Sequence, residues 1–246
     1  MILEIKKLSK SFGKQTIIDS LEVSLTGGTI VGLIGRNGVG KSTLFNCLAN
    51  ILEADTEEVY LNNNKIRLDD VNWKTKVGFV SDLIPVIEEF TILEYLKFIG
   101  AIYNVPEEHI EPRANELYNF FFDESSIYEN KKPIKSFSTG MMKKVQIMSS
   151  VIHKPVVLLL DEPFSGLDSI TSAKLVSFIK YYSNTENIII FTSHDLNHHK
   201  SLASNFLVLD KTKFIFQGDL PSLETFFVTN NLLSEIENAK LNFSWI

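Results

Sequence analysis

Apolar and polar residues follow two different periods along the chain, and the change of period predicts the order of the elements. Leu3 and Ile5, and later Val23 and Leu25, stand in segments where apolar and polar residues alternate, as in strands with one buried face. Residues 29–34 form a mainly apolar run that ends before a glycine. Beyond it, an amphipathic helix is predicted by the apolar stripe Leu44, Phe45, Leu48, Ile51 and Leu52. The pattern predicts a strand, a glycine-containing loop and a helix in succession.

The second half of the chain repeats the strand signal around another helix. Residues 156–160 and 187–191 are apolar runs of strand length. Between them, a helix is predicted by the apolar face Leu175, Val176, Ile179 and Tyr182. A strand, a crossover helix and a strand predict a parallel sheet buried on both faces, and hence an α/β protein. Residues 206–209 and 214–216 flank a polar turn and predict a hairpin.

Residues 83–150 differ from the rest of the chain because they show helical periodicity and few strand signals. We interpret them as a helical subdomain inserted between two parts of a core, residues 1–82 and 151–220, which includes a small antiparallel β-subdomain. Residues 221–246 are expected to form a short helix and a tail. The three phenylalanines at 120–122 are expected to pack in the core rather than to bind a ligand.

The composition is that of an ordinary globular protein. Of 246 residues, 44% are apolar and 22% are charged, which excludes disordered, collagen-like and disulfide-scaffold classes. A formal net charge of −6 gives no broad basic surface, so nucleic acid is not an expected partner. We expect no signal peptide, and no apolar run approaches the roughly 18 to 20 residues that cross a bilayer. The single cysteine, Cys47, fits a reducing compartment and is expected to have no functional role.

The loop after residues 29–34 has the spacing of a phosphate-binding loop. Gly35 is followed by four residues and then by Gly40, Lys41 and Ser42. Glycines let the backbone fold so tightly that successive N–H groups face an anion, and the following helix presents its N-terminus to it. We expect Lys41 to reach the β- and γ-phosphates and the Ser42 hydroxyl to bind Mg²⁺. The residues expected to hold the phosphates are Gly35, Arg36, Asn37, Gly38, Val39, Gly40, Lys41, Ser42 and Thr43.

An acidic pair follows another predicted buried strand. The run 156–160 leads into Asp161, and the carboxyl ends of strands are where open parallel sheets bind ligands, so Asp161 is expected to hold Mg²⁺ through water. Glu162 would face the γ-phosphate and orient or deprotonate the attacking water. Such a pair is usually structural or solvated when it stands alone, but its combination with Lys41 makes it a strong signal for a Mg²⁺- and phosphate-binding site.

These motifs, in this order, resemble those of the ATP-binding cassette (ABC) family over residues 1–220. Residues 137–144 are similar to the family's signature sequence, although in isolation the segment indicates only a helix start capped by Ser138. Two cassettes bind face to face in this family, so the resemblance implies that Ser138 and the Gly140 backbone contact ATP held by a partner subunit. Asp168 ends a segment similar to the loop that crosses the dimer interface, and is likewise implied to lie near the nucleotide.

Two further positions match residues of this family. His194 corresponds to the switch histidine that contacts the γ-phosphate, and Phe12 to the aromatic residue that stacks on adenine. Taken alone, Phe12 would be a core or turn residue, and a lone histidine is usually a surface one, so the joint order of the motifs carries both assignments. His198 and His199 could form a metal cluster with His194, but this reading is disfavoured because His194 already has a role.

The sequence departs from the family pattern in two places. Asp82 stands where the family usually has a glutamine that contacts Mg²⁺ and relays closure to the membrane subunit. Because a carboxylate can still accept from metal-bound water, Asp82 is kept as an expected residue of the metal site. The signature has Thr139 in place of a second glycine and Met141 in place of glutamine. Related variants occur in exporters of the ABC-2 type, which favours export.

The resemblance implies an ABC nucleotide-binding domain, with a P-loop NTPase core, a parallel sheet, an antiparallel β-subdomain and an inserted helical subdomain. It implies a Mg²⁺-dependent ATPase that pairs with a second ABC subunit, identical or different. It also implies a separate transmembrane permease subunit, contacted through the surface near residues 82–103, and a peripheral location on the cytoplasmic face of the cell membrane. ATP binding would close the pair, and hydrolysis would reopen it to drive transport.

Other functions fit parts of the sequence. A soluble ABC ATPase that acts as an assembly or regulatory factor, for example in iron–sulfur biogenesis, would carry the same nucleotide motifs but have no membrane companion. A binding module without turnover is disfavoured by Glu162 and His194. Ribosome-associated cassettes usually carry two phosphate loops and chromosome-type ATPases insert long coiled coils, whereas this sequence has one such loop and no room for that insertion.

Overall fold

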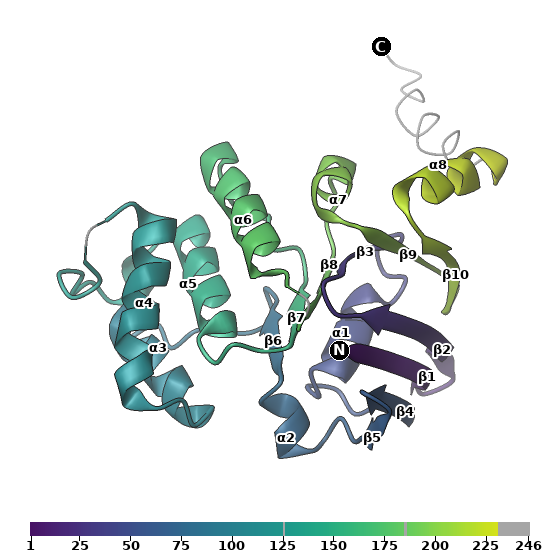
Figure 1. Ribbon diagram of the computed structural model, residues 1–246, viewed down its shortest axis with the longest axis horizontal. Coiled ribbons are helices and arrows are strands. Elements are labelled where there is room, and N and C mark those ends of the chain that lie inside the picture. Colours follow the sequence, from purple (N-terminus) through teal and green to yellow (C-terminus); the bar gives the residue numbers. More distant parts are fainter. Residues whose placement is uncertain (125, 185, 231–246) are drawn as a thin grey trace, which may run out of the picture.

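The computed structural model describes residues 1–124, 126–184 and 186–230, and contains two sheets with helices packed around them (Figure 1). One sheet is antiparallel and has the strand order β2-β1-β4-β5. Its strands are β1 (Ile2–Phe12), β2 (Gln15–Thr26), β4 (Thr56–Leu61) and β5 (Asn64–Ile66). The alternating segments near residues 3–5 and 23–25 are therefore strands, as predicted.

The second sheet has the strand order β10-β9-β3-β8-β7-β6. Neighbouring strands from β6 to β9 are parallel, and β10 is antiparallel to β9. The predicted parallel pair and the predicted hairpin are both confirmed, and the carboxyl ends of β3, β7 and β8 meet at one edge. The strands are β3 (Ile30–Ile34), β6 (Val77–Val80), β7 (Val157–Leu160), β8 (Ile188–Phe191), β9 (Asn205–Asp210) and β10 (Lys213–Gly218).

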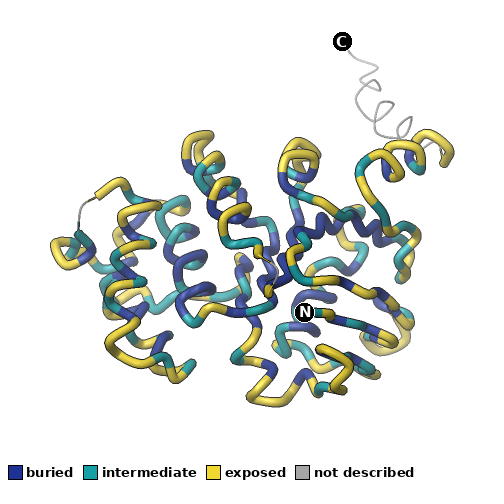
Figure 2. Tube along the Cα trace, viewed as in Figure 1, coloured by how far each residue is buried: buried dark blue, intermediate teal, exposed yellow. Residues whose placement is uncertain are grey.

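Alternate residues of the central strands face two different hydrophobic cores. In β7, Leu158 and Leu160 belong to a core shared with α3, α4, α5 and α6, whereas Val157 and Leu159 belong to a core shared with α1 and the antiparallel sheet. Successive side chains of a strand point to opposite faces, so a sheet covered on both sides requires continuous apolar runs. Figure 2 shows these strands as buried segments between helices whose outer turns are exposed.

The helices between β6 and β7 form a separate group beside the larger sheet (Figure 1). This group matches the predicted helical character of residues 83–150. Among the described residues, no helix is both long and apolar enough to cross a membrane. The helices are α1 (Lys41–Leu48), α2 (Val71–Lys74), α3 (Ile92–Ile102), α4 (Glu107–Phe122), α5 (Thr139–Val151), α6 (Ser169–Tyr182), α7 (Leu196–Leu202) and α8 (Leu220–Thr229), with a 3₁₀ turn at Ile134–Ser136.

Two expectations about apolar residues were wrong in part. Helix α1 ends at Leu48 because Asn50 adopts a left-handed backbone conformation with φ of 50°, and Ile51 beyond it is 59% exposed instead of continuing the buried stripe. In the aromatic run of α4, Phe121 is buried in the core as predicted, but Phe120 lies on the surface. Helix α8 covers the start of the predicted C-terminal segment, and residues 231–246 lie outside the described part of the chain.

Candidate functional site

The loop between β3 and α1 has the backbone that its glycines predict. Gly38 and Gly40 have φ of 76° and 113°, in the left-handed region that favours glycine. A Cβ on Gly35 would come within 2.6 Å of a backbone oxygen of β9, so only glycine fits there. Lys41 Nζ donates to the carbonyl oxygens of Gly35 at 2.7 Å and Arg36 at 3.1 Å. The lysine therefore folds back over the loop in which the phosphates are expected to bind.

The acidic pair follows β7 at the same edge of the sheet. Asp161 is buried, and Glu162 has a φ of 48°, which is costly for a residue with a side chain. A threonine at the end of β8 stabilises this turn. Its hydroxyl, Thr192 Oγ1, donates to Asp161 Oδ1 and accepts from the Glu162 backbone N–H, both at 2.8 Å. One buried hydroxyl thus fixes both carboxylate-bearing residues.

His194 contacts the second of these carboxylates. Its backbone N–H donates to Glu162 Oε2 at 3.2 Å, and its Nε2 lies 3.4 Å from Glu162 Oε1. The Glu162 Oε1 atom is buried without a hydrogen-bond partner, whereas the His194 side chain is 66% exposed. Glu162 therefore keeps an unused acceptor, and His194 has room to reach a ligand.

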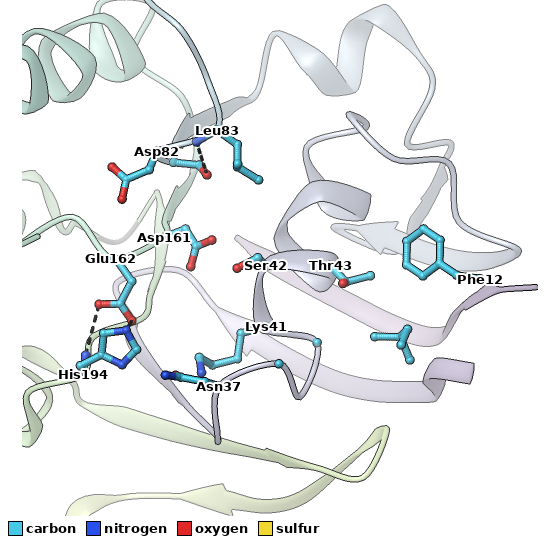
Figure 3. A pocket seen from close by; sticks show the side chains of 14 residues that line it. Phe12, Asn37, Lys41, Ser42, Thr43, Asp82, Leu83, Asp161, Glu162 and His194 are labelled. Atoms are coloured by element: carbon cyan, nitrogen blue, oxygen red, sulfur yellow. Dashed lines mark hydrogen bonds and ion pairs between the residues drawn. The ribbon is translucent and has the colours of Figure 1, made fainter. Parts of the chain in front are cut away.

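One pocket of about 410 Å³ brings most of these groups together, with Lys41 and Ser42 facing Asp161 and Glu162 across it (Figure 3). Gly35, Arg36 and Val39 belong to the loop but do not line the pocket. The lining residues are Phe12, Ile17, Asn37, Gly38, Gly40, Lys41, Ser42, Thr43, Ser81, Asp82, Leu83, Asp161, Glu162 and His194. Ile17, Ser81 and Leu83 were not among the predicted site residues, although Ser81 and Leu83 flank Asp82 in the sequence.

Burial sets the charge properties of the pocket. It lowers the pKa of Lys41, while the nearby carboxylates of Glu162 and Asp161 act in the opposite direction. Burial also raises the pKa of Glu162, against the effect of His194. Because burial disfavours the charged form of Lys41, the negative charge of bound phosphates would stabilise its ammonium group. A carboxylate with a raised pKa, such as that of Glu162, is a stronger proton acceptor.

The oxygen atoms near Ser42 fit a magnesium ion. The Ser42 hydroxyl and the Asp161 carboxylate point into the same part of the pocket (Figure 3), and Mg²⁺ prefers such hard oxygen ligands. Asp82, the third predicted ligand, lines the pocket, but its carboxylate is turned away from Ser42 (Figure 3) and accepts from Lys143 Nζ at 2.5 Å. The Lys143 side chain is 2% exposed, so Asp82 neutralises a buried ammonium of α5.

The signature residues Ser138 and Gly140, and Asp168 of the loop after Glu162, lie outside the pocket. Ser138 caps α5 by accepting from the Met141 N–H, and Asp168 caps α6 by accepting from the Thr171 N–H at 2.8 Å. A Cβ on Gly140 would come within 2.9 Å of a backbone oxygen in the loop that ends at Asp168. The structure therefore brings the signature and this loop together, but not with the pocket of the same chain.

Thr192 was also missed, although it directly follows the apolar run 187–191. We expect Thr192→Val, which keeps the shape but removes the hydroxyl, to lower the free energy of unfolding by about 1–3 kcal/mol because it leaves two buried polar atoms unpaired. The rate of ATP turnover should also fall, because Asp161 and Glu162 both lose the hydroxyl group that holds them in place. Denaturant unfolding and steady-state ATPase assays measure the two effects. Thr192→Ser keeps the hydroxyl and should restore both; a valine variant as stable and active as wild type would contradict this role.

Comparison with known proteins gives a consistent result. The family model described as ABC transporter matches residues 18–165. An uncharacterized ABC transporter ATP-binding protein of Methanocaldococcus jannaschii is 30% identical, over 90% of this chain and 79% of the relative. A lantibiotic transport ATP-binding protein of Streptococcus pyogenes is 28% identical, over 98% of both chains.

Solved structures agree on the fold. One described as the ATP-binding subunit of an ABC transporter superposes with a TM-score of 0.84 at 24% identity, and the match covers 96% of this chain and all of the other. The matched family model extends from β2 through the phosphate loop and the signature to the loop after Glu162. The chain therefore belongs to the ABC transporter family, as an ATP-binding subunit with an ABC ATPase domain.

Proposed function

We propose that the pocket between α1 and the ends of β7 and β8 is where this ATPase binds ATP with Mg²⁺ and hydrolyses it. The observation that carries the proposal is the meeting of Lys41 and Ser42 with Asp161 and Glu162 in one pocket. Their spacing in the sequence suggested this arrangement, and the parallel order of β3, β8 and β7 produces it.

Each group has a role that follows from its position. The loop N–H groups and Lys41 bind the phosphates, and Phe12, half exposed at the edge of the pocket, stacks on the adenine. Ser42 and Asp161 would hold Mg²⁺, which neutralises charge on the β- and γ-phosphates. Glu162, whose buried Oε1 has no hydrogen bond, accepts a proton from the attacking water or orients it. His194 contacts the γ-phosphate while its backbone N–H holds Glu162.

The chain acts in a pair, identical or mixed. Ser138, Gly140 and Asp168 lie outside the pocket of their own chain, which supports a face-to-face arrangement in which they complete the partner's nucleotide site. Gly140 and the loop ending at Asp168 pack against each other, so both would approach the partner together. We keep the division into a core, residues 1–82 and 151–220, and a helical subdomain, residues 83–150, because α3, α4 and α5 pack against one another, although their hydrophobic core continues into β7 and α6.

The membrane partner is a separate permease, and transport is outward. Relatives named for lantibiotic transport in Streptococcus pyogenes and for Nod factor export in Ralstonia nicotianae support export. The surface that would receive the permease carries Leu83, Phe98 and Ile102, apolar side chains that are exposed. The subunit would then sit on the cytoplasmic face of the membrane.

Isolation of the native complex tests this assignment. The tagged chain, extracted from membranes in mild detergent, is expected to bring with it an integral membrane subunit identified by mass spectrometry. Ile102→Glu places a charge on the proposed contact surface and should reduce that recovery without changing thermal stability. Val71→Glu, a matched change at an exposed site on α2, should leave it unaltered. A complex without any integral membrane protein would favour the soluble assembly factor instead.

A further inference from the structure

Two adjacent histidines hold the residue before His194 from two sides. Ser193 Oγ lies 2.9 Å from His198 Nδ1 and also accepts from the Asp195 N–H at 3.1 Å. The carbonyl oxygen of Ser193 lies 3.0 Å from His199 Nε2. The loop between β8 and α7 is therefore anchored by side chains of the helix that follows it.

The contact with His199 fixes the state of its ring. A carbonyl oxygen only accepts, so His199 Nε2 must carry the hydrogen, and Nδ1 is left as an unprotonated acceptor. That Nδ1 is buried and has no hydrogen-bond partner, and burial lowers the pKa of His199 to about 4. The ring is therefore neutral at physiological pH and serves as a single directed donor.

A glycine in β3 makes room for this ring. A Cβ on Gly32 would lie 2.5 Å from His199 Nδ1, too close for the ring to stay in place. The ring also stacks on Phe191, with centroids 4.8 Å apart. Gly32 and Phe191 are neighbours on adjacent strands, so the ring of His199 packs over both at one face of the sheet, and that packing sets the place of its Nε2.

His198 connects the same loop to the segment beyond Glu162. Its ring stacks on Phe164, with centroids 3.8 Å apart and planes 17° from parallel. Phe164 lies between Glu162 and the loop that ends at Asp168. His198 therefore holds Ser193 against a segment that starts two residues after Glu162, and His199 holds it against the sheet.

From these contacts we infer that His199 is a positioning residue for ATP hydrolysis: by binding the Ser193 carbonyl, it fixes the loop that directs His194 at Glu162, with His198 as its second anchor. The inference rests on the proposed site, in which His194 and Glu162 act on the γ-phosphate. It gives the two histidines a role that does not involve a metal.

Three variants of the full-length chain separate positioning from packing. His199→Gln keeps a nitrogen donor at the place of Nε2 and has no atom at the place of Nδ1, so kcat should stay within about twofold of wild type. His199→Ala removes the donor and should lower kcat on the order of 10-fold, because a displaced group costs rate without losing substrate contacts. Gly32→Ala should displace the ring and cause a similar loss. The affinity for ADP, which lacks the γ-phosphate, should be unchanged in all three.

The decisive measurement is the double variant Gly32→Ala/His199→Gln. The glutamine removes the ring atom that the added methyl group would meet at 2.5 Å, so only the Ala203 Cβ at 3.2 Å must shift slightly, and the glutamine still reaches Ser193. The kcat of the double variant should therefore recover relative to Gly32→Ala alone. The inference is overturned if His199→Gln is as slow as His199→Ala, if the double variant shows no recovery, or if kcat falls only together with ADP affinity and melting temperature. These experiments distinguish the role of His199 from the proposed ATP site. If the His199 variants had normal turnover while His194→Ala had impaired turnover, His199 would have no positioning role but the proposed site would stand.

Discussion

Replacing Glu162 by glutamine is expected to lower the rate of ATP hydrolysis by about 10²- to 10⁴-fold while ATP stays bound. Glutamine has nearly the same shape, so it can keep the contact with the His194 N–H through its amide oxygen. It cannot accept a proton from water at neutral pH. The variant should therefore lose turnover but keep its affinity for ATP, because the groups that hold the phosphates lie on the loop before α1 and at the start of that helix, and are unchanged.

Phosphate release at saturating ATP measures the turnover of this variant, and the nucleotide retained after gel filtration measures its binding. If the chains pair around ATP as proposed, the variant should also accumulate as an ATP-bound dimer, because hydrolysis no longer reopens it. Glu53→Gln is the matched control: it removes the same charge at an exposed position after α1 and should behave as wild type. Normal turnover in Glu162→Gln would show that another group activates the water.

The elements around the candidate site that were predicted correctly are those whose signal is continuous in the sequence. The apolar run of β7 is long enough for a strand buried on both faces, so the place of Asp161 at its carboxyl end followed directly. The spacing of Gly35 and Lys41 likewise fixes a loop before a helix, because glycine is needed at specific backbone conformations. Local pattern and chain topology were sufficient for these elements.

The parts that were missed depend on contacts between distant segments. Lys143 was part of the signature segment, but its burial against Asp82 depends on how α5 packs beside the loop after β6. The fit of His199 into the space left by Gly32 joins α7 to β3. Nothing in the sequence around these residues indicates their partners, which are brought close only by the packing of distant segments.

The pairing of Asp82 with Lys143 links the candidate nucleotide pocket to the signature helix. The carboxylate lies on a residue of the pocket wall, and the ammonium lies on the helix that begins with the signature. Gln146, on the same helix, donates to the carbonyl oxygen of Ile84 at 3.0 Å, so α5 is bound to this loop at two points. These two contacts join the wall of the pocket to the helix that carries the signature.

The second large effect is expected at Lys41. Lys41→Met keeps much of the length of the side chain but removes the ammonium, and hydrogen bonds to charged groups contribute about 1.5–3 kcal/mol each, so ATP affinity should fall roughly 10- to 150-fold. Hydrolysis should fall further, since the charge that develops on the transferred phosphoryl group loses a cation. Titration with a fluorescent ATP analogue measures the affinity, and phosphate release at saturating ATP measures the rate.

The loss of ATP affinity expected for Lys41→Met also depends on the contacts that Lys41 makes in the nucleotide-free protein. There the ammonium is partly buried and bonds to the carbonyl oxygens of Gly35 and Arg36, so binding of ATP exchanges these contacts for phosphate oxygens of full negative charge. Methionine leaves both carbonyls without this donor, and a lower melting temperature should accompany the loss of affinity. Lys65→Met, at an exposed site on β5, should change neither quantity. If Lys41→Met bound ATP as tightly as wild type, the phosphates would have to lie elsewhere, and the pocket would lose its assignment.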